Sequence, residues 1–205
     1  MKSTKDAPDQ FENESVLSDR MAQGGKQRSD LLLHELFEVQ ALHSPQAIAL
    51  VDSGVTLTYG DLDRRTNRFA HMLCTLGAKP NTLVAIVLDG GTPFVEAILA
   101  ALKCGSGYLP LDPTQPVARL SALLDDAQPL LLITTTEIAN AIQDCSVFKL
   151  CVDDLTTLQN LASQPEAPLQ PRQLGLTTDS IGYVIYTSVS TGTPKGVVMP
   201  QGPLL

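Results

Sequence analysis

Basic charge is scarce in this sequence, and so are the residue patterns that bind zinc. Its 205 residues hold 14 lysines and arginines against 22 aspartates and glutamates, a formal net charge of −8. This balance leaves no diffuse basic surface for a nucleic-acid backbone, so we predict no nucleic-acid partner. The four cysteines form no CxxC pair and the three histidines add no ligand spacing, which predicts reduced thiols and no metal site.

Long apolar runs are absent as well. No stretch approaches the roughly 18 apolar residues that a membrane-spanning helix needs. The first residues, MKSTKDAPDQFENESVLSD, are acidic and lack the apolar core of a secretory signal. No repeat of solenoid length is visible. The sequence therefore predicts a cytoplasmic protein that has no membrane partner.

Apolar periodicity divides the chain into two parts. Residues 1–30 are polar and are predicted to be a linker or arm, whereas residues 31–205 alternate between the two kinds of element. We predict helices at 31–43, 58–76, 93–103, 117–127 and 137–143, and strands at 47–52, 55–59, 83–88, 108–112, 130–134, 147–152 and 183–188. Several strands are apolar throughout, which indicates burial on both faces. The predicted fold is α/β, a largely parallel sheet covered by helices.

Local signals add detail to this prediction. Thr58 followed by Asp61 forms a capping-box-like start to the second helix, and Gly77 suits its carboxyl end. Residues 153–180 contain three prolines and lack a strong period, so they are predicted to be a long surface connection. The first helix is expected to present one face at helical spacing, formed by Leu33, Leu36, Phe37 and Gln40. Lys103 and Asp112 flank a predicted strand and are interpreted as polar caps.

The segment YTSVSTGTPKGV, residues 186–197, carries the clearest chemistry. A predicted strand runs into a loop of hydroxyls, small residues and one lysine, and such a loop offers phosphate oxygens backbone N–H groups, hydroxyl donors and a cation. It is not a Walker motif, because the lysine follows a proline and precedes a glycine. By composition alone, an ordinary hydroxyl-rich surface loop explains it equally well. The candidate phosphate-binding residues are Thr187, Ser188, Ser190, Thr191, Gly192, Thr193 and Lys195.

Three stretches in order carry a family resemblance. The loop segment resembles the signature YTSGSTGxPKGV, and LTYGDLDRRTNRFAHML resembles LTYxELxxxxNxLAxxL. LKCGSGYLPLDPTQPVARLSALLDDAQPLLLIT resembles LKAGxAYVPLDPxYPxxRLxxMLxDAxPxxLLT. These are patterns of the adenylate-forming, or AMP-binding, superfamily. The PLDP stretch resembles the amino acid adenylation domains of nonribosomal peptide synthetases more than fatty-acid-activating members. The resemblance runs from about residue 31 to the last residue and implies the N-terminal portion of the large subdomain.

The resemblance also implies a mechanism and partners. In this family a substrate carboxylate attacks the α-phosphorus of ATP with Mg2+, pyrophosphate leaves, and the adenylate is passed to a phosphopantetheine thiol. The loop would hold the β- and γ-phosphates, with Ser190, Thr191 and Gly192 nearest and Lys195 at the rim. The implied partners are ATP, an amino acid, and carrier-protein and condensation domains. The stretch before residue 31, with SVLSD, resembles the linker after a condensation domain. We assign no residue a catalytic role.

Three departures from the family pattern leave alternatives open. Val189 stands where the signature has glycine, which predicts weaker phosphate binding if that position needs a positive φ. Gln201 stands where many relatives carry a histidine that is close to the active site. The chain stops at residue 205, so we expect an incomplete AMP-binding domain that is inactive alone and has exposed apolar sheet edges. The alternatives are a non-catalytic or decayed adenylation-like domain, an acyl-CoA synthetase-type relative, and an unrelated α/β nucleotide-binding module.

Overall fold

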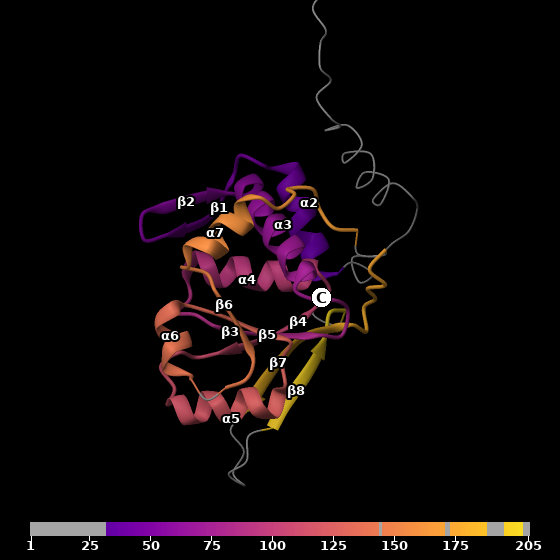
Figure 1. The fold of residues 1–205 in the computed structure, drawn as a ribbon. Coiled ribbons are helices and arrows are strands. Elements are labelled where there is room, and N and C mark those ends of the chain that lie inside the picture. The colour runs from indigo at the N-terminus through magenta and orange to yellow at the C-terminus, as the bar shows by residue number, and fades with distance from the viewer. Residues whose placement is uncertain (1–31, 144, 171–172, 188–194, 203–205) are drawn as a thin grey trace, which may run out of the picture.

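The structure, a computed structural model, describes residues 32–143, 145–170, 173–187 and 195–202, and the predicted linker at 1–30 lies outside them. Helices and strands alternate along most of this part of the chain (Figure 1). In chain order they are α2 (Leu33–His43), β1 (Ile48–Asp52), β2 (Val55–Thr58), α3 (Tyr59–Thr75), β3 (Leu83–Val87), α4 (Gly91–Lys103), β4 (Gly107–Leu111), α5 (Val117–Ala127), β5 (Leu131–Thr134), α6 (Thr136–Ala141), β6 (Phe148–Cys151), α7 (Leu155–Ala162), β7 (Ile181–Thr187) and β8 (Lys195–Pro200).

The main sheet has six strands in the order β6-β5-β3-β4-β7-β8. Every neighbouring pair from β6 to β7 is parallel, and only β8 runs antiparallel to its neighbour. Helices α3, α4 and α7 cover one face and α5 covers the other (Figure 1). The predicted α/β fold with a largely parallel, helix-covered sheet is therefore confirmed.

Strand β3 shows why the sheet is buried on both faces. Val84 and Ile86 contribute to the cluster under α3 and α4, whereas Ala85 and Val87 contribute to the cluster over α5. All four side chains are completely buried. A strand with two apolar faces is stabilised only when helices lie against both of them, which is the reason its sequence shows no alternation.

Helix α3 begins and ends as its sequence predicts. The hydroxyl of Thr58 accepts a hydrogen bond from the backbone N–H of Asp61 at 3.1 Å, and the Asp61 carboxylate accepts from the Thr58 backbone N–H at 3.3 Å. At the other end Gly77 has a φ of +97°, and the N–H of Ala78 donates to the carbonyl of Leu73 at 2.9 Å. These bonds form a capping box and a Schellman motif.

The predicted surface connection at 153–180 is partly wrong, because it contains helix α7. After α7 the chain is held to α3: the side-chain amide of Asn67 donates to the carbonyl of Glu166 at 2.8 Å, and a ring nitrogen of His71 lies 2.9 Å from the carbonyl of Ala167. Further on, Leu176 is buried against Gly105, where an added Cβ would lie 3.1 Å from the leucine. These contacts guide the chain across the sheet to β7, beside β4.

The residues at helical spacing in the first helix are half-buried, except for Gln40, which is exposed. Helix α2 buries Leu32 just before its start and then a largely polar set, namely His34, Glu35, Glu38 and Ala41. Lys103, which is 1% exposed and does not cap a strand, approaches this face at Glu38. Its ammonium lies 2.6 Å from both the Asp63 carboxylate and the Asn67 side-chain oxygen, and 3.8 Å from Glu38. A buried charge therefore joins α2, α3 and α4.

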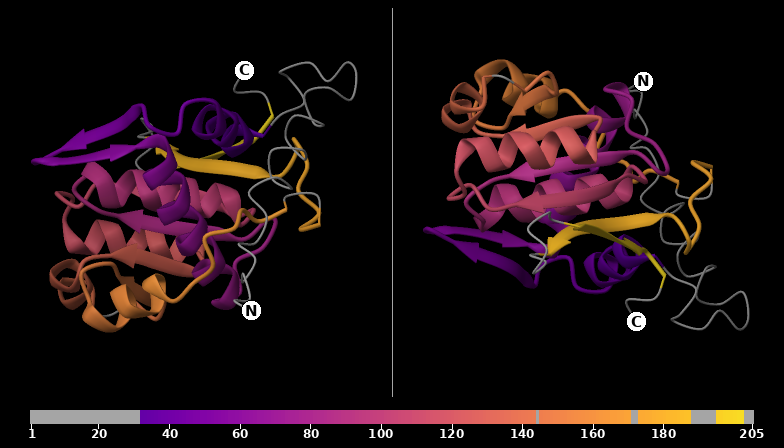
Figure 2. Two further views of the ribbon diagram at one scale, coloured as in Figure 1. Left: turned by 90° about the horizontal axis from the view of Figure 1, so that it is seen from above. Right: turned by 90° about the horizontal axis from the view of Figure 1, so that it is seen from below.

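Strands β1 and β2 form an antiparallel hairpin that projects beside the main sheet (Figure 2). Its turn supports helix α4, because the carboxylate of Asp52 accepts a hydrogen bond from the backbone N–H of Thr92 at 2.8 Å. This bond lowers the pKa of Asp52. Gly91 has a φ of +68°, and a Cβ there would lie 2.4 Å from the carboxylate. Only glycine leaves room for Asp52 to cap the helix.

Both edges of the main sheet present apolar side chains to solvent. Phe148 on β6 is 56% exposed, and Val197 and Val198 on β8 are 45% and 55% exposed. The expectation of exposed apolar edges is therefore confirmed.

Candidate functional site

The candidate site is the hairpin that joins β7 to β8. The two strands pair antiparallel with Thr187 opposite Lys195, so the connecting residues leave from and return to adjacent strand ends. Both side chains at the base of the hairpin are exposed. Of the other candidates, Ser188, Ser190, Thr191, Gly192 and Thr193 lie outside the described residues, as does Val189. The structure thus brings together Thr187 and Lys195.

The base of this hairpin lies at the carboxyl edge of the parallel strands. Strand β7 runs parallel to β4 with Tyr183 opposite Tyr108. Continuing that register places Asp112, just after β4, level with Thr187. Open parallel sheets bind ligands in the crevice at this edge, where the strands give way to loops. The position of the hairpin therefore suits a ligand site.

Tyr186 fixes the end of β7. Its hydroxyl donates a hydrogen bond to the carboxylate of Asp126 on α5. Its cross-strand partner is Gly196, where a Cβ would lie 3.4 Å from the tyrosine ring. Burial, and then the bond to Asp126, raises the pKa of Tyr186 to about 12. The phenol therefore stays neutral and keeps donating at physiological pH, which holds the strand end that precedes the loop.

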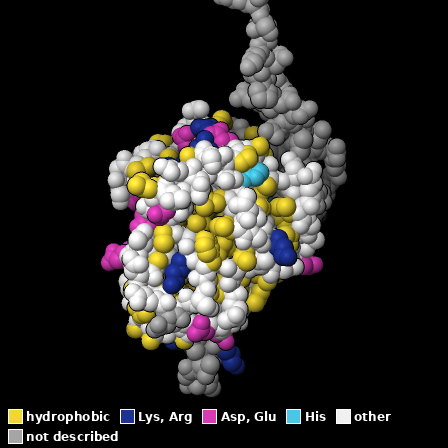
Figure 3. Space-filling view, in the orientation of Figure 1, with side chains coloured by type: hydrophobic (Ala, Val, Ile, Leu, Met, Phe, Trp, Pro, Cys, Tyr) yellow, Lys and Arg dark blue, Asp and Glu magenta, His cyan; other side chains and the backbone are white. Residues whose placement is uncertain are grey.

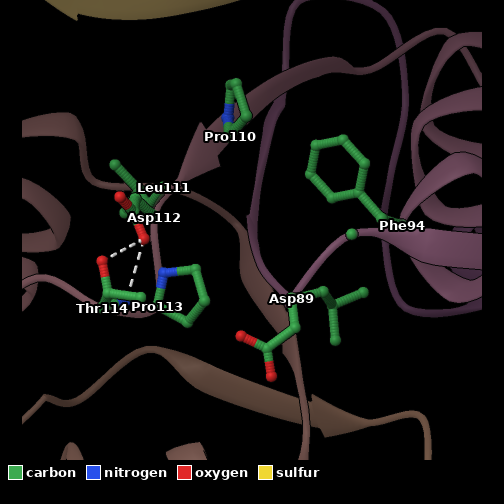
Figure 4. Close-up of a pocket in the computed structure, with 9 residues that line it drawn as sticks. Asp89, Phe94, Pro110, Leu111, Asp112, Pro113 and Thr114 are labelled. Atoms are coloured by element: carbon green, nitrogen blue, oxygen red, sulfur yellow. Dashed lines mark hydrogen bonds between the residues drawn. The ribbon is translucent and has the colours of Figure 1, made fainter.

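A shallow pocket of about 310 Å³ lies at the same edge, at the ends of β3 and β4. Phe94 from α4 forms one wall, and Pro110, Leu111 and Pro113 form the opposite one (Figure 4). On the molecular surface more generally, hydrophobic side chains also gather in the middle of the face that Figure 1 presents (Figure 3). The apolar walls suit an apolar group better than a phosphate.

Two carboxylates border this pocket, and its lining contains no lysine or arginine. Asp112 accepts hydrogen bonds from the backbone N–H and hydroxyl of Thr114 at 2.8 and 2.7 Å, and these bonds lower the pKa of Asp112. Asp89 is exposed beside it (Figure 4). The negative charge of these carboxylates disfavours a phosphate in this pocket.

Lys195 is the basic group of the hairpin. It is exposed, and no side chain in the described ranges forms an ion pair with it. An ammonium without a carboxylate partner is available to an anionic ligand. The described residues hold no group of three histidine, cysteine, aspartate or glutamate side chains that could bind a metal ion. They also include no helix long and apolar enough to cross a bilayer.

Gln201 lies away from this site, which corrects the expectation from the family pattern. It follows β8 at the end opposite Lys195, and its backbone N–H donates to the carbonyl of Ser180 at 2.9 Å. The six residues of β8 separate the two positions by about 20 Å of extended chain. Gln201 is 1% exposed, and within the described residues neither polar atom of its side chain has a hydrogen-bond partner. It belongs to the amino edge of the sheet.

The fold and the hairpin define an α/β protein with a candidate phosphate site at the carboxyl edge of a parallel sheet. The sequence pattern of the AMP-binding enzyme family matches residues 37–205. This match covers most of the chain, so the chain belongs to that family.

Known relatives are much longer than this chain. It is 42% identical over 167 residues to malpinin synthetase of Mortierella alpina, covering 82% of this chain and 2% of that protein. It is 40% identical over 172 residues to a dimodular nonribosomal peptide synthase of Bacillus subtilis (strain 168), covering 82% of this chain and 7% of that protein. The chain therefore spans a small part of the length of the relatives it matches.

Solved structures agree with the fold. The chain is similar to the nonribosomal peptide synthetase FmoA3 in its alpha-methyl-L-serine-AMP-bound form, with a TM-score of 0.75 and 29% identity, covering 92% of this chain and 20% of that one. It shares its fold with VinN at a TM-score of 0.76 and 24% identity, covering 86% of this chain and 45% of that one.

Proposed function

We propose that this chain is the amino-terminal portion of an amino-acid-activating adenylation domain in nonribosomal peptide synthesis. The hairpin from Thr187 to Lys195 holds the β- and γ-phosphates of ATP, with Lys195 at the rim. An amino acid carboxylate attacks the α-phosphorus, pyrophosphate leaves, and the aminoacyl group passes to a phosphopantetheine thiol on a carrier domain. Residues beyond this chain supply the amino acid pocket.

The pairing of Thr187 with Lys195 at the carboxyl edge carries this proposal. It puts a hydroxyl and an ammonium that no described side chain pairs with at the two ends of a loop that offers further hydroxyls and glycine. Such an arrangement acts by positioning the phosphates and neutralising their charge. Mg2+ arrives with ATP and is held chiefly by phosphate oxygens and water, as is usual for nucleotide sites.

The relatives support amino acids rather than fatty acids as substrates, because two that are 40% identical to this chain are named as a nonribosomal peptide synthase and a probable nonribosomal peptide synthetase. FmoA3 has also been solved with AMPPNP bound, at 30% identity to this chain. The proposal includes carrier-protein and condensation domains as partners, a cytoplasmic location and a product of secondary metabolism.

Calorimetry on the chain with MgATP and with AMP tests the hairpin's role. We expect ATP to bind more tightly than AMP, because AMP lacks the two phosphates that the hairpin holds. Lys195→Ala should weaken ATP about tenfold, the usual order for one charge-assisted contact. Lys79→Ala is the matched control, because this exposed lysine precedes β3 at the opposite edge. Equal affinities for ATP and AMP, or equal losses in the two variants, would refute the role of the hairpin.

A chimera tests the activity. Joining this chain to the remainder of an adenylation domain from the Bacillus subtilis dimodular synthase supplies the missing pocket, and amino-acid-dependent exchange of pyrophosphate into ATP reports adenylation. Val189→Gly should increase exchange, because glycine accepts a positive φ and leaves room for phosphate. Exchange that depends on fatty acids would support an acyl-CoA synthetase-type relative, and no gain from the glycine would contradict the inference about Val189.

A further inference from the structure

One side-chain bond ties the end of β7 to helix α5. The hydroxyl of Tyr186, the residue before Thr187, donates it to the carboxylate of Asp126. Asp126 lies in the last turn of α5, which ends at Ala127. The two bonded residues are 60 positions apart, so the bond joins elements that only the fold brings together.

The tyrosine ring contacts both strands at the base of the hairpin. It is half-buried and packs against the buried cluster between the sheet and α5. Gly196 lies opposite Tyr186 on β8, and a Cβ on that glycine would lie 3.4 Å from the ring. The ring is therefore fixed by packing on two sides, and the bond to Asp126 fixes its hydroxyl.

The next pair along the hairpin is Thr187 with Lys195. A shift of the tyrosine ring would therefore be passed directly to the two residues between which the phosphate loop leaves and returns. Ligand groups that are already in place before binding cost less to order, and small misplacements of such groups weaken the contacts they make. A bond that holds Tyr186 thus bears on how well the hairpin holds phosphate.

We propose that Asp126 is a positioning residue of the phosphate hairpin and that it acts through the Tyr186 hydroxyl. This inference rests on the proposed function, because it takes the hairpin to hold the phosphates of ATP. The charge of Asp126 works against that task, since a carboxylate near a phosphate site repels the ligand. Its benefit to ATP binding is therefore the hydrogen bond, which keeps the end of β7 against α5.

Asp125 provides the matched control. It precedes Asp126 in the same turn of α5, carries the same charge and is likewise exposed. Its backbone carbonyl accepts a hydrogen bond from the Gln128 side chain, and a side-chain substitution leaves that carbonyl in place. Asp125→Ala and Asp126→Ala therefore remove equal charge from nearly the same place, and only the second removes the bond to Tyr186.

Calorimetry on the full chain with MgATP and with AMP compares these two variants. By charge alone, both should bind ATP slightly more tightly than the unaltered chain. We expect Asp126→Ala instead to weaken ATP by about threefold to tenfold, the order of one lost hydrogen bond. Its affinity for AMP should equal that of Asp125→Ala, because AMP lacks the two phosphates that the hairpin holds. Circular dichroism establishes that each variant is folded.

Three more variants test whether the effect passes through the tyrosine hydroxyl. Asp126→Asn should restore most of the ATP affinity, because the amide oxygen accepts the same bond. Tyr186→Phe should lose as much as Asp126→Ala does. The variant that combines Tyr186→Phe with Asp126→Ala should lose no more than either change alone, because both remove one interaction. Losses that add in the combined variant would contradict the pairing.

Amide hydrogen exchange gives a readout that does not require ATP. Peptides that cover β7 and β8 should exchange faster in Asp126→Ala than in Asp125→Ala, whereas peptides that cover α3 should exchange alike in both. Equal exchange across β7 and β8 in the two variants would overturn the inference that α5 holds the hairpin.

The outcomes separate this inference from the proposed function. If the unaltered chain prefers ATP to AMP but Asp126→Ala binds ATP as Asp125→Ala does, the positioning role is overturned and the proposed function stands. If the unaltered chain shows no preference for ATP, the proposed function fails and the role in phosphate binding fails with it. Faster exchange confined to Asp126→Ala would then still support the hold of α5 on the end of β7.

Discussion

Replacing Lys103 by methionine should destabilise the protein more than any exposed lysine substitution. Methionine keeps an unbranched apolar chain in the same space but removes the ammonium. The carboxylate of Asp63 and the side-chain oxygen of Asn67, both 2.6 Å from that ammonium, then lose their donor. Glu38, 3.8 Å away and also buried, loses this ion-pair contact.

The size of this effect follows from burial. Removing one partner of a buried ion pair costs about 3–5 kcal/mol, because the other charge remains in a medium that solvates it poorly. Whole domains are stable by only about 5–15 kcal/mol, so the change is a large fraction of the total. Urea unfolding followed by circular dichroism measures it, with Lys79→Met as the exposed control. A loss below about 1 kcal/mol, typical of surface pairs, would refute the view that Lys103 is the buried charge that joins α2, α3 and α4.

Three further changes test other contacts. Gly91→Ala should destabilise more than Gly90→Ala in urea unfolding: both positions have a positive φ, but only at Gly91 would a Cβ collide with Asp52. In Tyr186→Phe, the free energy of unfolding should fall less than in the unaltered chain as the pH rises from 10 to 12. The pKa of Tyr186 is about 12 in the folded protein and 10.0 ordinarily, so the stabilisation that depends on its neutral form is complete below pH 10 and disappears toward pH 12. Gln201→Leu should raise the free energy of unfolding by about 1–3 kcal/mol, because it removes a buried amide to which no described residue forms a hydrogen bond. A lower free energy in that variant would count against this reading.

Sequence predicted the elements whose signals are local. Thr58, Asp61 and Gly77 specify the ends of α3 through bonds to near neighbours, and those bonds are present. The apolar runs around β3 and β5 predicted a sheet buried on both faces, because such strands need cover on two sides. These predictions needed only spacing and side-chain type.

Two features were missed. Helix α7 is only eight residues long, but its leucines recur at helical spacing and the Asp154 carboxylate accepts a hydrogen bond from the backbone N–H of Thr157 at its start, so its signal was local and was overlooked among the prolines that follow. On the buried face of α2, Glu38 lies 3.8 Å from the ammonium of Lys103, which is about 60 positions later in the chain. No local period signals an ion pair of that kind.

The site was found because strand and loop are contiguous in the sequence, but its surroundings depend on the sheet. Lys195 and Gln201 are near each other along the chain, yet β8 carries them to opposite edges. Asp112 and Thr187 are far apart along the chain, yet they lie at the carboxyl ends of β4 and β7, which run side by side and parallel. In a parallel sheet, residues meet when they follow adjacent strands, not when they follow the same one. Searches for substrate-contacting residues in this chain should therefore begin at the carboxyl ends of β3 and β4, beside the hairpin, and not downstream along β8.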